Sequence, residues 1–165
     1  MESGPRSGCP INQAVEVFGD PWAMLVLRDI MFGNLRYFRE ILTGSEEGIA
    51  SNILSSRLKH LVAAGLLTKE EAGRGHRSAY SLTEAGIQAL PIMVAFGNWG
   101  LTHRDGEPRL RVRQEVLRDG GPELMDRFMD ELREIHLSIP LPNPESPRAT
   151  TQIVAAYEAA ISNSE

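Results

Sequence analysis

Residues 48–65 read GIASNILSSRLKHLVAAG. Three leucines recur at helical spacing and form an apolar stripe: Leu54, Leu58 and Leu61. With Gly65 as the C-terminal cap, the pattern predicts a helix over residues 50–64. At about 100° per residue, the opposite side of this helix is small, polar and cationic. It consists of Asn52, Ser56, Lys59 and Ala63, flanked by Ser55 and His60. No acidic residue occurs between Gly48 and Thr68, as expected of a surface that meets a polyanion.

An amphipathic helix, a mostly buried helix and a shorter one are expected before this stretch. Apolar residues at i, i+3, i+4 and i+7 predict a helix over residues 11–18. Asp20 is placed to cap the next helix while Pro21 takes its first position, and this mostly buried helix stops at Gly33. A short helix around residues 38–42 follows an extended segment.

A β-hairpin and another helix are expected after it. Residues 66–71 and 77–82 are strand candidates, and the AGRGH segment between them supplies the glycines of a hairpin tip. Polar and apolar residues alternate in the second strand, so one face should pack while the other meets solvent. Thr83 is placed to cap a further helix, with a kink at Pro91 and an end near residues 97–100.

The sequence changes character after Trp99. A polar stretch at residues 102–114 and a Gly-Gly-Pro turn at residues 120–122 precede an amphipathic helix. A proline-dense linker at residues 140–147 separates it from a last amphipathic helix. The apolar faces of these two helices need a cover. Three alternatives are open: these faces pack on their own domain, they pair with a second subunit, or they enclose an effector pocket.

This order of elements is that of a winged helix-turn-helix, in which one helix enters the DNA major groove and the hairpin wing touches the adjacent backbone. The expected fold class is mainly α with a small β-hairpin (α+β). We expect a flexible N-terminus at residues 1–8, a winged helix-turn-helix DNA-binding domain at residues 9–105, and a helical extension at residues 106–165.

The side chains on the outer face of the 50–64 helix suit DNA. Asn bonds adenine bidentately, Ser reaches bases or phosphates, and Lys neutralises a phosphate. Cations at the glycine-rich hairpin tip would grip the flanking backbone, although a plain charged hairpin has the same composition. The candidate DNA contacts are Arg36, Ser51, Asn52, Ser55, Ser56, Arg57, Lys59, His60, Arg74, His76 and Arg77.

The charge distribution is compatible with this interpretation. The 165 residues include 17 Lys and Arg against 22 Asp and Glu, a net charge of -5, which argues against nonspecific coating of nucleic acid or an anionic membrane. Residues 36–80 hold seven bases and five acids, a net charge of +2. A winged-helix module that binds a protein instead of DNA is the alternative function. DNA affinity that falls steeply with salt distinguishes the two.

Other classes of protein are disfavoured. A single cysteine excludes a disulfide within the chain and a multi-cysteine zinc site, and it fits a reducing cytoplasm. The N-terminus lacks the apolar stretch of a signal peptide, and the uncharged run at residues 85–103 is too polar to span a membrane. Scattered histidines and the lack of a nucleophile motif predict a protein without catalytic residues, cofactor or metal. From its cysteine usage we expect it to be cytoplasmic.

Short motifs spread over residues 8–105 are specific when they occur together. They include Cys9-Pro10-Ile11, Gly33-Asn34-Leu35-Arg36-Tyr37-Phe38, Gly48-Ile49-Ala50-Ser51-Asn52-Ile53-Leu54, Tyr80-Ser81-Leu82-Thr83-Glu84-Ala85-Gly86 and Trp99-Gly100. In this order they resemble the HxlR-type winged-helix transcriptional regulators of bacteria, in the MarR superfamily. The resemblance implies a homodimer, paired through the first and last helices of the domain, on a pseudo-palindromic operator. The extension after residue 105 departs from the family pattern.

The implied dimer also assigns roles to apolar residues and to the cysteine. The expected interface is Ile11, Val15, Phe18, Met93, Phe96 and Trp99, with Phe128 and Leu132 from the extension. Cys9 lies where some family members have a thiol that senses oxidants, quinones or aldehydes, and its place before a helix and near Arg6 permits such reactivity. Alternatively, Cys9 packs as a small apolar residue at the dimer seam. The expected partners are double-stranded DNA, a second copy, and a small-molecule or oxidant effector, with no membrane.

Overall fold

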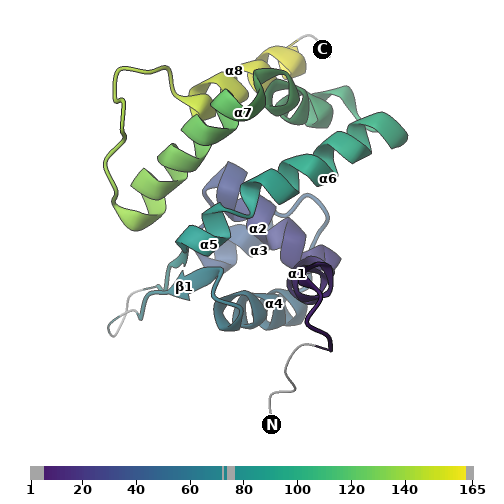
Figure 1. Ribbon diagram of the computed structural model, residues 1–165, viewed down its shortest axis with the longest axis vertical. Helices are drawn as coiled ribbons and strands as arrows, with labels where there is room; N and C mark the ends of the chain where they lie inside the picture. Colours follow the sequence, from purple (N-terminus) through teal and green to yellow (C-terminus); the bar gives the residue numbers. More distant parts are fainter. Residues whose placement is uncertain (1–5, 72, 74–76, 163–165) are drawn as a thin grey trace. The chain divides into compact units, whose positions relative to one another are not determined.

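The computed structural model describes residues 6–71, 73 and 77–162. The chain divides into two compact units, Met1–Gly86 and Ile87–Glu165. The described part is mostly helical with a two-stranded antiparallel hairpin, which confirms the predicted fold class (Figure 1). The domain boundary at residue 105 stays a prediction.

The first unit holds the predicted helices and hairpin in the predicted order. Its elements are α1 (Pro10–Phe18), α2 (Pro21–Gly33), α3 (Phe38–Gly44), α4 (Ser51–Ala63), β1 (Leu67–Lys69), β2 (Tyr80–Leu82) and α5 (Glu84–Ile87), whose last residue begins the second unit. Asp20 caps α2 as predicted, because its Oδ1 accepts a hydrogen bond of 2.9 Å from the Ala23 amide. Asn34 ends α2 in the left-handed conformation (φ 48°), which Asn tolerates.

The core of the first unit lies where α4 packs on α2, with α3 and the hairpin at its sides. Leu54, Leu58 and Leu61 are each at most 1% exposed, which confirms the leucine stripe. The buried residues of α2 are Ala23, Val26, Leu27, Ile30 and Met31. Burying one leucine stabilises a fold by about 1.5–3 kcal/mol, so the stripe fixes which side of α4 faces outward.

The hairpin is shorter than predicted and is buried differently. β1 pairs with β2 so that Leu67 faces Leu82 and Lys69 faces Tyr80. All three residues of β2 are buried, so the predicted alternation between packed and solvated residues is wrong. The segment before α3 is the reason. Its Arg36 carbonyl accepts a hydrogen bond of 2.8 Å from the Tyr80 amide, and its Arg36 guanidinium covers Ser81.

The second unit consists of α6 (Leu90–His103), α7 (Pro108–Leu137) and α8 (Ala149–Ser162). Pro91 lies in the first turn of α6, where proline is tolerated, so it begins a helix and does not kink one. The predicted end of α6 near residues 97–100 is also wrong. Gly97 instead lets α7 approach, since a Cβ there would stand 2.1 Å from Oε1 of Gln114. Gln114 Nε2 donates to the Val94 carbonyl at 3.0 Å.

Helix α7 begins within the polar stretch, at Pro108, and it is bent. Gly121 has φ 60° and ψ -158°, a conformation essentially restricted to glycine, so the predicted Gly-Gly-Pro turn exists as a kink between two helical halves. The first half is bound to α6 through Gln114 and through Arg111, which donates to the carbonyls of Leu101 and Arg104. These polar side chains replace the apolar contacts that sequence periodicity detects.

Helix α8 lies beside α7 (Figure 1) and contacts both of its halves, through Arg113 before the kink and Glu131 after it. The carboxylate of Glu131, 3% exposed, accepts hydrogen bonds from the amides of Ala149 and Thr150 at the start of α8. Near the other end of α8, the Tyr157 ring lies 3.8 Å from the Arg113 guanidinium, measured to the ring centroid. Residues 138–148, which include the predicted linker, contain no helix or strand.

Part of the apolar face of the extension is covered within one chain, while Ile135, Val154 and Ile161 stay exposed. Between α7 and α8 lies a buried set of residues: Leu117, Leu124, Phe128, Leu132, Ala149 and Ile153. Phe128 and Leu132 are each 1% exposed, so neither is available to a second subunit. We therefore remove both from the predicted dimer interface and assign them to the core of the second unit.

Candidate nucleic-acid interface

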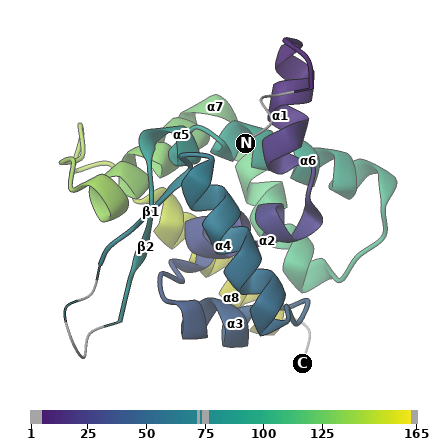
Figure 2. The ribbon, with the colours of Figure 1, turned by 90° about the horizontal axis from the view of Figure 1, so that it is seen from below.

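The outer face of α4 is open to solvent. Ser51, Asn52, Ser56 and Lys59 are exposed, and Ser55 is half-buried. They share one side of the helix because the leucines on the other side are packed on α2 (Figure 2). The face therefore presents amide, hydroxyl and ammonium groups and no carboxylate of its own helix, which suits contact with bases and phosphates.

Arg57 and His60, both predicted DNA contacts, are directed toward the α1–α2 turn. Arg57 Nε lies 2.8 Å from Oδ1 of Asp20, and His60 Nε2 lies 3.3 Å from the Val17 carbonyl oxygen. Both side chains thus make contacts within the unit. Arg57 Nη1 also lies 3.5 Å from Ser56 Oγ on the exposed face of α4, and the role of Arg57 and His60 as DNA contacts stays a prediction.

Arg36 is likewise engaged within the unit. Its Nε donates to the Tyr80 carbonyl at 3.3 Å, and its Nη2 donates to Ser81 Oγ and lies 3.7 Å from a carboxylate oxygen of Glu70. These contacts fasten the segment before α3 to the hairpin. In this arrangement the residue supports the wing, and its role as a DNA contact stays a prediction.

The wing cations can be described only in part. Arg74 and His76 lie outside the described residues. The Arg77 guanidinium lies 5.2 Å from the centroid of the Tyr37 ring, in a cation–π contact. Tyr37, which sequence reasoning did not select, therefore holds the one described member of the cation cluster near the base of the wing.

A charged cluster fixes the loop before α4. Arg28 on α2 donates to both carboxylate oxygens of Glu47, at 2.6 and 2.7 Å, and to Asp29 at 2.7 Å. The hydrogen bonds from Arg28 lower the pKa of Glu47, whereas burial raises the pKa of Asp29. No periodic pattern marks Arg28 and Glu47, which are 19 positions apart, so sequence reasoning missed this pair.

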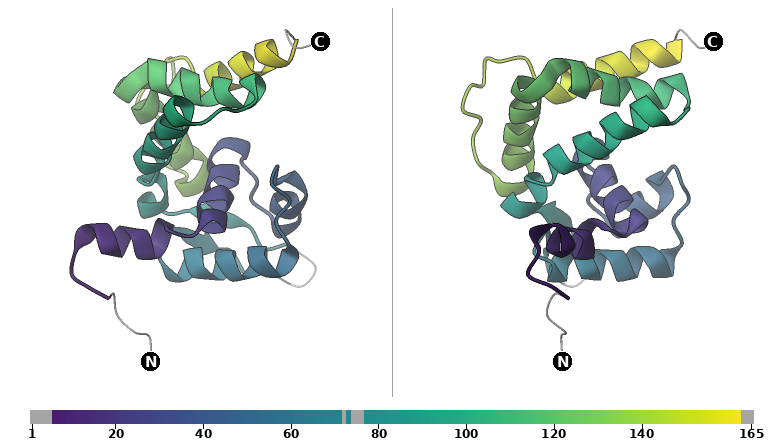
Figure 3. Two further views of the ribbon diagram at one scale, coloured as in Figure 1. Left: turned by 90° about the vertical axis from the view of Figure 1, so that its right-hand side faces the viewer. Right: turned by 45° about the vertical axis from the view of Figure 1, so that its right-hand side comes forward.

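The predicted interface residues outside the extension are accessible to different degrees. Ile11 and Val15 on α1 are 75% and 52% exposed, and α1, which projects from α2, has no buried residue (Figure 3). On α6, Phe96 and Trp99 are 60% and 53% exposed. Phe18 and Met93 are half-buried. Each helix therefore leaves an apolar face uncovered within its own unit.

Cys9 is an exposed free thiol at the N-cap of α1. The cation that the sequence placed near it is engaged elsewhere, because Arg6 Nε lies 3.1 Å from the Glu16 carboxylate. The Cys9 thiol is thus accessible to solvent, while Arg6 is paired with a carboxylate on α1.

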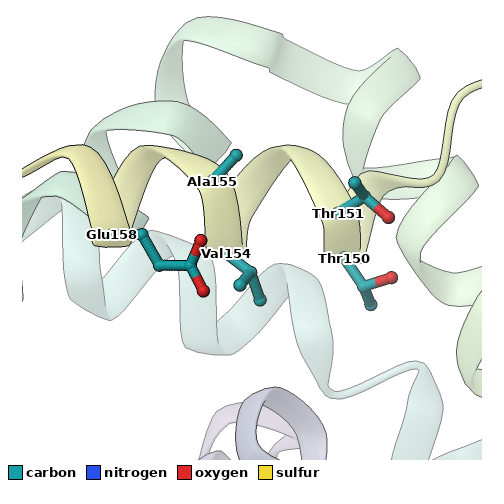
Figure 4. A pocket seen from close by; sticks show the side chains of 5 residues that line it. All are labelled: Thr150, Thr151, Val154, Ala155 and Glu158. Atoms are coloured by element: carbon teal, nitrogen blue, oxygen red, sulfur yellow. The ribbon is translucent and has the colours of Figure 1, made fainter.

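No metal-binding group of His, Cys, Asp or Glu occurs among the described residues. Within the same ranges, every helix is too short or too polar to cross a membrane. A shallow hollow runs along α8, and Figure 4 shows Thr150, Val154 and Glu158 among the side chains that line it. It encloses no convergent set of polar groups.

A family model for HxlR-like helix-turn-helix proteins matches residues 17–108, more than half of the chain. The chain belongs to this HxlR-like family. The match includes α2, α3, α4, the hairpin and α6, so the family's shared region contains the exposed face of α4 and ends where α7 begins.

Individual relatives of this chain are named as helix-turn-helix regulators. The uncharacterised HTH-type transcriptional regulator Rv3095 of Mycobacterium tuberculosis is 34% identical over 105 residues, which cover 61% of this chain and 65% of that protein. YybR of Bacillus subtilis, also an uncharacterised HTH-type transcriptional regulator, is 29% identical over 103 residues, covering 61% and 79%. The chain thus matches less than two thirds of the mycobacterial relative. The crystal structure of PA1607, a candidate transcription factor, superposes with a TM-score of 0.56 at 34% identity, over 62% of this chain and 70% of that one.

Proposed function

We propose that this HxlR-like protein is a transcriptional regulator that binds specific double-stranded DNA through α4 and the wing. The observation that carries the proposal is the exposed face of α4, where Asn52, Ser56 and Lys59 lie together on a helix without acidic residues. In a winged helix this helix enters the major groove, where asparagine reads adenine and lysine neutralises a phosphate. Ser51 and Ser55 would add contacts to bases or to the backbone.

The proposed regulator is a homodimer on a pseudo-palindromic operator. In support, α1 is amphipathic and yet leaves Ile11 and Val15 in solvent, and α6 leaves Phe96 and Trp99 uncovered within its own unit. Exposed apolar faces of this kind mark interaction surfaces. A two-fold dimer places its two recognition helices about 34–36 Å apart, which matches half-sites one turn of DNA apart.

Substitutions on α4 test the DNA-binding roles. Asn52→Ala is expected to weaken binding to the operator by about 1–3 kcal/mol and to relax preference at one base pair, while binding to random DNA stays unchanged. Lys59→Ala is expected to weaken binding to all sequences alike and to reduce the slope of log affinity against log salt by about one unit. The operator is first selected from a random duplex library, and affinities are then measured by fluorescence anisotropy.

Gln152→Ala, which removes an exposed amide on α8, is the matched control and leaves both affinities unchanged. Equal losses on operator and random DNA for Asn52→Ala contradict its base-reading role. A wild-type protein that binds no duplex at any salt concentration contradicts the function itself and favours the alternative, a winged-helix module that binds another protein.

A finer part of the proposal assigns oxidant sensing to Cys9, whose thiol is exposed. Cys9→Ser is expected to retain operator affinity under reducing conditions and to abolish the change in affinity caused by peroxide or a quinone. Anisotropy with and without oxidant, together with intact mass, measures this. If oxidant changes the operator affinity of the wild type and of Cys9→Ser equally, Cys9 is not the oxidant sensor.

A further inference from the structure

The α1–α2 turn is held by α4 at two points. Arg57 and His60 are three residues apart, so they project from the same side of α4. Arg57 reaches Asp20 on one side of Gly19, and His60 reaches the Val17 carbonyl on the other side. The recognition helix therefore contacts the end of α1 and the start of α2 together.

The chemistry of the two contacts is complementary to the ends of the two helices. Val17 lies in the last turn of α1, where carbonyl oxygens lack partners within the helix, so the His60 Nε2–H donates to an acceptor that would otherwise be unpaired. Asp20 already caps α2 through the Ala23 amide, and its carboxylate also neutralises Arg57. The N–H of Arg57 Nε is not aligned for a hydrogen bond, and this atom is shielded from solvent, so the contact is an ion pair in a place where charge attraction exceeds that in water.

We propose that Arg57 and His60 are positioning residues that fix the rotation of α4 against the α1–α2 turn and thereby set sequence specificity. They do not contact phosphate. The inference rests on the proposed DNA-binding function and replaces the role that the sequence suggested for these two residues. Its basis is a pair of contacts to one turn, each made by a different chemical group.

Specificity is the property that this arrangement controls. A side chain that reads a base edge must be held to within about 0.5 Å and 10–20° of its productive geometry, whereas an attraction between lysine and phosphate tolerates larger displacement. Asn52 is on the same helix as both anchors. Loosening the contacts of Arg57 and His60 with the α1–α2 turn therefore misplaces Asn52 more than it weakens the general attraction of α4 for DNA.

The test compares variants that remove the ion pair from either side. Asp20→Asn keeps the cap of α2, because asparagine caps as well as aspartate, and it removes only the charge that faces Arg57. Asp20→Asn and Arg57→Gln are each expected to reduce the ratio of operator to random-DNA affinity about tenfold, and the double variant no further. The salt slope stays within about half a unit of the wild-type slope. Lys59→Ala is the control whose slope falls by about one unit.

His60 is tested by conservative rescue. His60→Ala is expected to lower the specificity ratio, and His60→Gln, which keeps a side-chain N–H donor, is expected to restore it. A salt slope that falls by about one unit in Arg57→Gln or His60→Ala identifies a phosphate contact and overturns the proposal. Additive losses in Asp20→Asn and Arg57→Gln overturn it as well.

Amide hydrogen exchange without DNA separates this inference from the proposed function. Arg57→Gln and His60→Ala are expected to speed exchange at residues 17–23 and in the first turn of α4, at an unchanged thermal midpoint. If the wild type binds no DNA, the proposed function fails and the anchoring is decided by exchange alone. Unchanged exchange at residues 17–23 overturns the anchoring even if the DNA-binding function holds.

Discussion

Phe128→Ala is expected to lower the free energy of unfolding by about 3–5 kcal/mol, the range observed when a fully buried aromatic ring is truncated and leaves a cavity. The ring is 1% exposed on α7 and belongs to the buried set between α7 and α8. Urea unfolding at a protein concentration low enough to exclude self-association measures the loss.

Phe96→Ala is the matched control, because it makes the same chemical change at a side chain that is 60% exposed. Its effect on monomer stability is expected to stay within about 0.5 kcal/mol, while self-association weakens. Equal losses of stability in the two variants would mean that Phe128 is not part of a packed core, and the correction to the predicted interface would fail.

Val15→Asp is expected to turn the proposed dimer into a monomer at nanomolar concentration. A carboxylate without a partner inside an apolar interface removes about 2–3 kcal/mol of association energy, or roughly 100-fold in the dimer dissociation constant. Operator affinity then falls by mass action, because a monomer meets only one half-site. Sedimentation velocity measures the first effect and anisotropy the second.

Gln13→Asp controls for charge on α1, since Gln13 is an exposed polar residue of the same helix. It is expected to remain dimeric. Val15 is 52% exposed in the single chain, so Val15→Asp leaves the fold of the monomer intact, as circular dichroism would report. A Val15→Asp protein that sediments as a dimer at nanomolar concentration places the interface elsewhere, with the uncovered α6 face as the next surface to test.

The winged-helix region could be predicted from the sequence because its signals are local. The stripe of Leu54, Leu58 and Leu61 identifies the buried side of α4, and a cap such as Asp20 acts within three residues along the chain. Both depend on helical periodicity or on adjacent positions. The order of the elements and the exposed face of α4 followed from these signals.

Features that depend on distant partners were missed. Helical periodicity placed His60 beside the outward face, and Arg57 was a candidate DNA contact. No pattern in the sequence shows that Val17 and Asp20 meet these two side chains. Gly97 is a residue type that is typical of helix ends, and in the structure it is the position that Gln114 packs against. In each case the deciding partner lies 17 to 43 positions away, beyond any periodic window.

The bend at Gly121 is held by α8. One end of α8 is fastened to the second half of α7 through Glu131, and Tyr157, toward its other end, is fastened to the first half through Arg113. Helix α8 therefore bridges the two halves of α7. It fixes the angle between them, which the backbone freedom of Gly121 would otherwise leave variable. Removing residues 149–162 is therefore expected to release the angle between the two halves of α7.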